Sequence, residues 1–259
     1  MSLKQVIVDT STTALSIALI EDKAIQLATT IQGPKKHGEA LVDVVHQSLS
    51  QVNWTPQLID ELIVGVGPGS YTGLRIGVTF AKAWSVMKKM PLKSVSSLSL
   101  IAANGISLHQ DHTLIIPIMD ARRQTAYTGA YTYEAGQLKS VISDCHTAWD
   151  HWLEALKTNI ELLKLERLIL VGEKIDEFIQ LTQEAFPHLT MDVIEGWSSL
   201  PHAENVLLVE QQIVQEPTLL APNYALETLA ERQWAKEQAV NLSEVEHDAL
   251  VERFPDTLE

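Results

Sequence analysis

Short apolar runs separated by polar turns open the chain. The runs KQVIVDT, TALSIALI and KAIQLATT are rich in β-branched side chains, and the segment DTSTT at residues 9–13 follows the first of them. Such runs, bounded by turn-forming residues, are typical of β-strands joined by tight turns. We therefore expect the chain to begin with three strands.

A helical period replaces this pattern after the breaker QGPKK. The apolar residues then recur three or four positions apart, at Leu41, Val44, Val45, Leu49 and Val52. This spacing places them on one face of an amphipathic helix. The run ELIVGV predicts a buried strand, residues 72–89 a second helix that Pro91 ends, and SSLSLIAAN a third helix.

The same succession restarts in the second half. TLIIPIMD, QTAYTGAYTYE, LKSVISDC and RLILVG predict strands, and helices are expected around residues 147–165 and 175–186. Two similar α/β units suggest a duplicated architecture, although periodicity does not give the strand order. We expect one lobe over residues 1–107, a second over 108–221, and a helical tail over 222–259 that packs back on the lobes.

Charge is distributed unevenly along the chain. The formal net charge is −14, made up of +2 over residues 1–105, −10 over 106–225 and −6 over 226–259. An acidic chain is a poor nucleic-acid binder by itself, because neutralising phosphates supplies most of that affinity. A role in RNA chemistry would therefore require a partner that supplies positive surface.

The composition also limits the compartment. No apolar run reaches the length that spans a bilayer, and no basic-then-apolar leader is visible, so we expect no membrane association. Cys145 is the single cysteine, which excludes an internal disulfide and favours a reducing compartment such as the cytoplasm. We interpret Cys145 as a small structural residue, because nothing beside it resembles an activating site.

The stretch VGPGSYTGLRIG, residues 66–77, concentrates glycine between a predicted strand and a predicted helix. It matches neither the phosphate loop of nucleotide hydrolases, nor the dinucleotide fingerprint, nor the nucleophile elbow. It does predict a tight turn and a helix start near Thr72, whose backbone N–H groups could accept an anion.

Small residues recur every fourth position in the helix after this loop, at Gly73, Gly77, Ala81 and Ser85. Each glycine costs about 1 kcal/mol of helix propensity relative to alanine, so close approach of another backbone is the natural compensation. A bulky stripe lies beside it, at Ile76, Phe80, Trp84 and Met87. Spacing alone favours packing inside the same lobe over a subunit interface.

The segments VIVDTSTTALSIAL, KHGEALVDVV, VGVGPGSYTGLRIGVTFAKAW, SVSSLSLIA and PIMDARRQTAY resemble the TsaB (YeaZ) family of tRNA threonylcarbamoyladenosine biosynthesis proteins. The resemblance covers most of residues 4–130, whereas the second half matches only through PNY. It implies an α/β fold of the actin/Hsp70/sugar-kinase-like (ASKHA) class, made of two ribonuclease-H-like lobes.

The resemblance also implies a role. Members are cytoplasmic, non-catalytic subunits that pair with and activate the catalytic sibling TsaD, which modifies the tRNA adenosine next to the anticodon. The ATPase TsaE joins the complex, and tRNA is reached only through it. No cofactor is implied for this chain, because ATP is used by the complex. A homodimer is expected when the partner is absent.

Pairing in the family uses helices of the first lobe. The resemblance therefore implies that the small-residue face of the second helix forms a subunit interface, although spacing alone favours packing inside the lobe. The implied interface residues are His37, Leu41, Val44, Val45, Gly73, Ile76, Gly77, Phe80, Ala81 and Trp84. The implied motif loop comprises Gly67, Pro68, Gly69, Ser70, Tyr71, Thr72 and Arg75. The superfamily's first turn contacts nucleotide phosphates, here through Asp9, Thr10 and Ser11, although such a turn also commonly bonds its own backbone.

The sequence departs from the family in two places. Gly38 follows His37 where serine is usual, and the segment after Pro222 lacks the usual arginine. An alternative that rests on the phosphate-like first turn also stays open, a nucleotide-binding enzyme of the same fold with kinase-like or protease-like chemistry. None of the nine histidines forms the i, i+4 pair of the catalytic sibling, and no metal site is expected.

Overall fold

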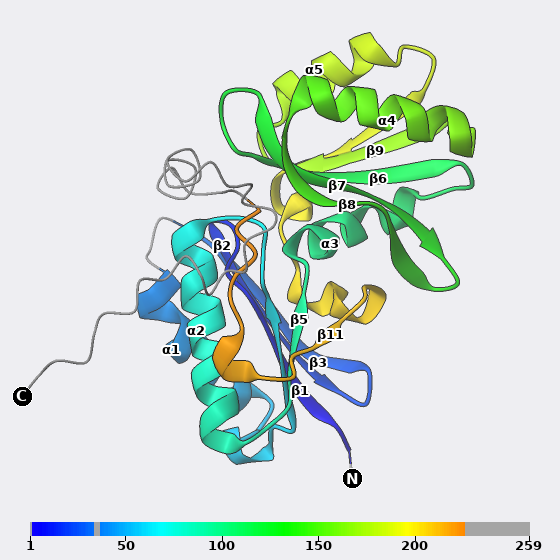
Figure 1. The fold of residues 1–259 in the computed structure, drawn as a ribbon. Helices are drawn as coiled ribbons and strands as arrows, with labels where there is room; N and C mark the ends of the chain where they lie inside the picture. Colours follow the sequence, from blue (N-terminus) through cyan, green and yellow to red (C-terminus); the bar gives the residue numbers. More distant parts are fainter. Residues whose placement is uncertain (1, 34–36, 226–259) are drawn as a thin grey trace, which may run out of the picture. The chain divides into compact units, whose positions relative to one another are not determined.

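A computed structural model describes residues 2–33 and 37–225 and shows two mixed β-sheets, each with helices packed on it (Figure 1). In the first sheet the strands lie in the order β11-β5-β4-β1-β2-β3. The first three strands form an antiparallel meander, and β4 and β5 run parallel to β1 on its other side. The elements of this lobe are β1 (Lys4–Asp9), β2 (Ala14–Glu21), β3 (Ala24–Gln32), α1 (His37–Gln51), β4 (Glu61–Gly65), α2 (Tyr71–Lys88), β5 (Leu92–Val95), α3 (Ser97–Ala102) and β11 (Gln212–Ile213).

The second sheet repeats this arrangement. Its order is β10-β9-β6-β7-β8, with β6, β7 and β8 antiparallel and with β9 and β10 parallel to β6. The elements are β6 (Thr113–Asp120), β7 (Thr125–Glu134), β8 (Gln137–Ala148), α4 (Trp149–Leu163), β9 (Arg167–Gly172), α5 (Asp176–Ala185) and β10 (Thr190–Ile194). Apart from β11, which the first sheet adds at its edge, the two sheets have the same strand order, and this confirms the predicted pair of ribonuclease-H-like lobes.

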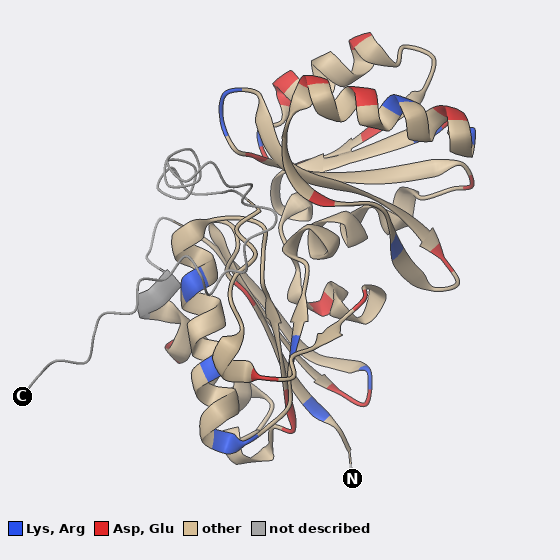
Figure 2. Cartoon of the chain, viewed as in Figure 1, with Lys and Arg blue, Asp and Glu red and all other residues tan. Residues whose placement is uncertain are grey.

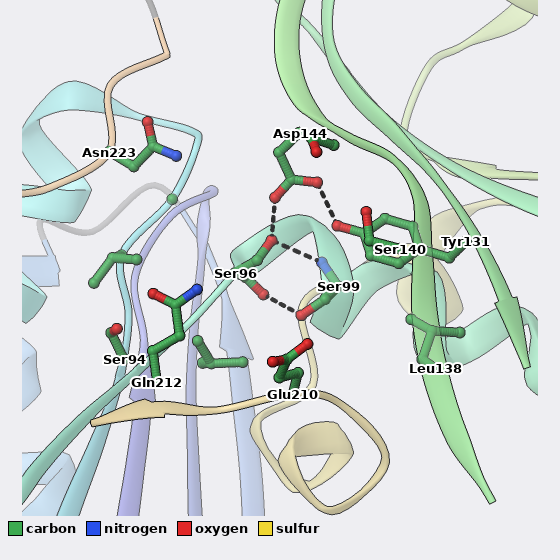
Figure 3. Close-up of a pocket in the computed structure, with 14 residues that line it drawn as sticks. Ser94, Ser96, Ser99, Tyr131, Leu138, Ser140, Asp144, Glu210, Gln212 and Asn223 are labelled. Carbon is green, nitrogen blue, oxygen red and sulfur yellow. Dashed lines mark hydrogen bonds between the residues drawn. The ribbon is translucent and has the colours of Figure 1, made fainter. Parts of the chain in front are cut away.

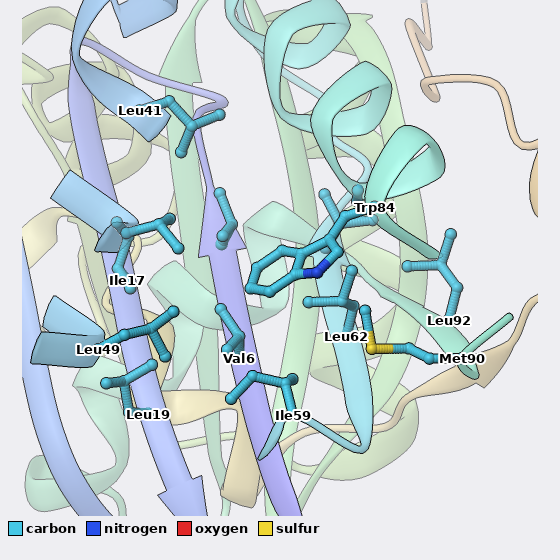
Figure 4. Close-up of a cluster of buried hydrophobic side chains, with 14 of the residues drawn as sticks. Val6, Ile17, Leu19, Leu41, Leu49, Ile59, Leu62, Trp84, Met90 and Leu92 are labelled. Atoms are coloured by element: carbon cyan, nitrogen blue, oxygen red, sulfur yellow. The ribbon is translucent and has the colours of Figure 1, made fainter. Parts of the chain in front are cut away.

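Side chains that alternate along β1 supply two different cores. Val6 and Val8 face a cluster that α1 and α2 cover, whereas Ile7 faces the opposite side of the sheet. Figure 4 shows the first cluster, in which α1 contributes Leu41 and Leu49. This two-sided burial explains why the first strand is almost continuously apolar.

The second face of the first sheet shares its core with the second sheet. Ile7 and Ile63 of the first sheet belong to one buried cluster with Ile115 and Ile169 of the second, and α3 contributes to the same cluster. The opposite face of the second sheet is covered by α4 and α5. The layers therefore follow one another as α1 with α2, the first sheet, α3, the second sheet, and α4 with α5.

The segment after β10 returns to the first sheet. Beyond β10, short 3-10 helices lead back to the first sheet, where β11 pairs antiparallel with β5. The backbone N–H of Ala203 donates to Ser16 Oγ of β2 at 2.8 Å. Residues 1–225 therefore form one compact unit, and separate lobes ending at residues 107 and 221 stay a prediction.

Two expectations remain, one about the helical tail and one about membrane-spanning helices. Residues 226–259 lie outside the described residues, so the packing of the expected helical tail stays a prediction. Within the described part of the chain, no helix has the length and apolar character needed to cross a bilayer.

Candidate functional site

The glycine-rich loop is clamped between two other segments. It follows β4, and Ser70 caps the first turn of α2 by accepting a hydrogen bond from the Gly73 N–H at 3.3 Å. Gly67 has φ +104°, and a Cβ there would lie 2.6 Å from the carbonyl oxygen of Asn223. A Cβ on Gly69 would overlap the carbonyl oxygen of Ser11. Glycine is needed at these positions because neighbouring backbone leaves no room for a side chain.

Backbone hydrogen bonds fix the same loop to its surroundings. The Ser70 N–H donates to the Ser11 carbonyl oxygen at 2.7 Å, and the Asn223 N–H donates to that of Val66 at 2.7 Å. The Gly67 N–H donates to Ser97 Oγ at 3.1 Å. The loop is thus a structural joint between the first turn, the start of α3 and the segment at residue 223.

The side chains of the first turn bond within the protein. Asp9 Oδ1 accepts hydrogen bonds from the Ser11 N–H at 2.8 Å and from Ser11 Oγ at 2.6 Å, and Asp9 Oδ2 accepts from Ser97 Oγ at 2.6 Å. Thr10 Oγ1 donates to the Gly73 carbonyl oxygen at 2.7 Å. Asp9, Thr10 and Ser11 are all buried. These contacts match the expectation of a self-bonded turn, and nucleotide contact stays a prediction.

The small-residue face of α2 packs inside the lobe. A Cβ on Gly73 would overlap the Thr10 carbonyl oxygen, and one on Gly77 would overlap Thr10 Oγ1. Ala81 is buried in the core cluster, and Ser85 Oγ donates to the Met90 carbonyl oxygen at 2.7 Å. These contacts give Gly73, Gly77 and Ala81 an intramolecular packing role, and their assignment to a partner interface stays a prediction. Their lack of side chain lets α2 approach the first turn closely.

Three further members of the expected interface are largely buried in the chain itself. Leu41 and Val45 of α1 and Trp84 of α2 belong to the core cluster and expose little surface. Their apolar spacing holds the helices on the sheet. Ile76, Phe80 and Val44 lie on the same helices but are only partly buried. The side chain of His37 lies outside the described residues.

An exposed apolar groove lies between α1 and α2. It has a volume of about 580 Å³. The residues that line it are Leu41, Val42, Tyr71, Thr72, Arg75, Ile76, Thr79, Phe80 and Ala83. Val42 is 61% exposed and Tyr71 51% exposed, so the groove presents large apolar groups to solvent. We refer to this set as the α1/α2 groove. Contiguous apolar surface of this kind marks interaction sites.

Sequence reasoning found only part of the groove. The predicted bulky stripe of α2 includes two lining residues, Ile76 and Phe80. Leu41 of α1 also lines the groove, although its side chain is largely buried. Val42 and Thr79 were missed because they sit one position from the strongest periodic residues. Arg75 was assigned to the motif loop, and its guanidinium lies over the Tyr71 ring, 5.5 Å from the centroid.

The helix that forms one wall of the groove is basic. The α2 sequence YTGLRIGVTFAKAWSVMK contains Arg75, Lys82 and Lys88 and no acidic residue. Acidic residues instead gather on α4 and α5 of the other lobe (Figure 2). The expected charge asymmetry of the chain is therefore visible as a spatial separation. Of the three basic residues only Arg75 lines the groove, because Lys82 and Lys88 donate to the carbonyl oxygens of Leu220 and Pro56.

A second concavity lies between the lobes and has a volume of about 1210 Å³. The turn residue Ser11 and the loop residue Gly69 line one side, and Asp120 and Tyr127 line the other. Asp120 Oδ1 accepts the Arg122 N–H at 2.7 Å, so residues 120–122 form a turn closed by this side chain. Burial raises the pKa of the Tyr127 phenol, which therefore stays protonated at neutral pH.

Comparison with known proteins identifies a family and individual relatives. The family model described as TsaD: tRNA N6-adenosine threonylcarbamoyltransferase matches residues 31–234. The tRNA threonylcarbamoyladenosine biosynthesis protein TsaB of Bacillus subtilis is 43% identical over 152 residues, covering 58% of this chain and 64% of that protein. Escherichia coli TsaB is 30% identical over 124 residues, covering 48% of this chain and 53% of that protein. The matches thus span less than two thirds of these relatives.

Solved structures show the same fold. YeaZ from Pseudomonas aeruginosa aligns with a TM-score of 0.60 at 21% identity, over 93% of this chain and 99% of that one. An uncharacterised P. aeruginosa protein with similarity to peptidase YeaZ aligns with a TM-score of 0.69 at 22% identity, over 86% of this chain and 100% of that one. At these identities the likeness supports the architecture alone.

Proposed function

The chain belongs to the family that the TsaD model describes, among the proteins named TsaB (YeaZ), and from this premise we propose that it acts in forming threonylcarbamoyladenosine on tRNA. Its role is that of a non-catalytic subunit that pairs with a TsaD-type sibling and activates it. The α1/α2 groove is the observation that carries the proposal, because it is apolar and open to solvent.

The groove has the form of an interface core. Val42 and Phe80 contribute apolar surface from different helices, and Tyr71 and Arg75 are residue types enriched at energetically important contacts. A stable interface buries about 800 Å² on each partner, so the groove would form the centre and the polar residues of α1 and α2 the rim. A sibling of the same family would offer a comparable pair of helices.

The remaining parts of the proposal follow from charge and from the turn. The net charge of −14 disfavours direct tRNA binding, so tRNA would be held by the sibling. Asp9, Thr10 and Ser11 are engaged in contacts that hold the fold, which supports a subunit without its own chemistry. ATP would be used elsewhere in the complex, with TsaE as the ATPase.

Assembly with the TsaD subunit of the same organism tests the proposal. We would mix the purified chains and measure the mass of the products by size-exclusion chromatography with light scattering. A mixed complex that raises threonylcarbamoyladenosine formation supports the proposal. If no mixed complex forms and the chain alone binds ATP–Mg²⁺, the proposal fails in favour of the nucleotide-binding enzyme.

Matched variants locate the surface. Val42→Asp places a charge in the groove, whereas Leu162→Asp places the same charge on α4, where Leu162 is 75% exposed. We expect only the first to prevent assembly, because burying an unpaired carboxylate is strongly unfavourable. If the chain alone forms a homodimer that Val42→Asp also disrupts, both associations use one surface.

A further inference from the structure

A polar pocket lies where the carboxyl end of β5 meets the hairpin of β7 and β8 (Figure 3). Its volume is about 380 Å³. Hydroxyl groups predominate in its lining, which includes Ser94, Ser96, Ser99, Ser140, Ser143 and Tyr131. Two carboxylates, those of Asp144 and Glu210, and two side-chain amides complete the polar surface. The pocket shares no lining residue with the α1/α2 groove or with the concavity that Ser11, Gly69, Asp120 and Tyr127 line.

A β-bulge places Asp144 in this pocket. The register of β7 against β8 pairs Thr128 with Cys145 and Ala130 with Ile142, so that Ser143 and Asp144 both face Gly129. A Cβ on Gly129 would lie 2.6 Å from Asp144 Oδ1. The absence of a side chain at that position therefore leaves space for the carboxylate. Bulges often re-aim a side chain near a functional site.

Hydroxyls from both lobes hold the Asp144 carboxylate. Ser96 Oγ, at the start of α3, donates to Oδ2, and the Tyr131 hydroxyl, on β7, donates to Oδ1. Ser96 Oγ itself accepts the Ser99 N–H at 3.1 Å. A carboxylate offers about four acceptor positions, so about two remain for a ligand.

The charge of this carboxylate is not balanced by the lining. Burial raises the pKa of Asp144, although the hydrogen bonds from Ser96 and Tyr131 oppose this rise. Among the described residues, none of those that line the pocket is Lys, Arg or His, and Glu210 adds a second negative group. A cation entering the pocket would supply the missing countercharge.

We propose that this pocket binds a small hydroxylated primary amine, with the ammonium group against Asp144 and the hydroxyls against the serines. The ammonium donates three hydrogen bonds, which suits the free acceptor positions of the carboxylate. Serine hydroxyls both donate and accept, so they suit a polyol body rather than an apolar one. An anionic ligand is disfavoured, because both ionisable groups facing the cavity other than Tyr131 are carboxylic acids.

The size of the pocket limits the ligand. Its volume is near the lower end of the range for small-molecule sites, about 300 Å³ and upward. Apolar lining is confined to Val66, Val95 and Leu138. A single amino sugar or amino alcohol therefore fits better than a nucleotide, which would also bring phosphate charge.

Isothermal titration calorimetry with glucosamine and glucose tests the proposal, since these probes differ in an ammonium and a hydroxyl group at one carbon. We expect saturable binding of glucosamine to the full chain and binding of glucose that is about tenfold weaker or more. Asp144→Asn should reduce glucosamine affinity by a similar factor. Asp111→Asn, which removes a charge from an exposed loop of the same lobe, should leave it unchanged.

The outcomes are decisive in either direction. Far-ultraviolet circular dichroism establishes that each variant is folded, and Ser140→Ala, at an exposed position of the lining, provides a second and milder test. The proposal is overturned if the wild-type chain binds neither glucosamine nor ethanolamine, if glucose binds as well as glucosamine, or if folded Asp144→Asn keeps full affinity. None of these results depends on assembly through the groove.

Discussion

The hydroxyl of Thr10 donates a hydrogen bond of 2.7 Å to the carbonyl oxygen of Gly73, and so ties the first β-turn to the first turn of α2. The next small residue along the helix, Gly77, lies against the same hydroxyl. This pairing gives the repeated small residues of α2 an intramolecular role.

Gly77→Ala should lower the free energy of unfolding by about 1–3 kcal/mol, because the added methyl group overpacks a buried site. An ordinary glycine-to-alanine change inside a helix would instead stabilise it by about 1 kcal/mol. Urea denaturation measures the difference. Thr10→Ala in the Gly77→Ala background should recover part of the loss, since it removes the atom that a Cβ would overlap.

The matched control is Ala83→Gly, at an exposed position of the same helix. It should cost about 1 kcal/mol through helix propensity alone. If Gly77→Ala proves more stable than the wild type, the close packing of α2 on Thr10 is not as described.

Asp9→Asn should destabilise the fold by about 2–4 kcal/mol. In the wild type both carboxylate oxygens of Asp9 accept hydrogen bonds from the hydroxyls of Ser11 and Ser97. In the variant the NH₂ group would replace one of these acceptors and leave one hydroxyl facing another donor. Thermal unfolding with and without ATP–Mg²⁺ measures both stability and ligand binding. The contrary outcome is a variant of unchanged stability that has lost an ATP-dependent rise in Tm shown by the wild type. That result would assign Asp9 to nucleotide binding.

Asp144 should make the wild type relatively more stable as the pH falls. Because burial raises its pKa above the usual 3.8, the native state binds the proton more tightly than the unfolded chain. Its ionised form therefore lowers the free energy of unfolding at neutral pH, and this cost is relieved as the pH falls through the native pKa. Each unit of pKa difference corresponds to about 1.4 kcal/mol.

Urea denaturation of the wild type and Asp144→Asn between about pH 7 and pH 4 measures this effect, in the range where a raised carboxyl pKa titrates. The stability of the wild type relative to the variant should increase toward acid. A difference that stays constant, or that shifts the other way, would show that Asp144 is not a poorly stabilised buried charge. Asp111→Asn serves as the exposed control.

Strong periodicity made much of the fold predictable. The strands around Ile7, Ile17 and Ile115 contain continuous apolar runs because both faces of each sheet are covered, and the duplicated order followed from their succession. Two short strands were missed. β5 spans only Leu92–Val95, and β10 is partly exposed, so neither carries a distinctive pattern.

The spacing of residues along α2 does not show which neighbouring segment each face of the helix contacts. Gly77 and Phe80 lie on neighbouring stripes of one helix, but only the first contacts the first turn. Small residues permit close approach of any backbone, and the sequence does not say which. The pocket at Asp144 was also hidden, because it depends on a bulge opposite Gly129 and on residues from both lobes.

The affinity of the chain for its own organism's TsaD subunit tests the central claim most directly. Isothermal titration calorimetry would compare the wild type with Val42→Asp and Leu162→Asp, after circular dichroism has shown that both variants are folded. The account predicts a Kd that rises by about 30-fold or more for Val42→Asp, as for the loss of a central contact, and is unchanged for Leu162→Asp. Equal affinities for all three chains would contradict assignment of the α1/α2 groove as the pairing surface.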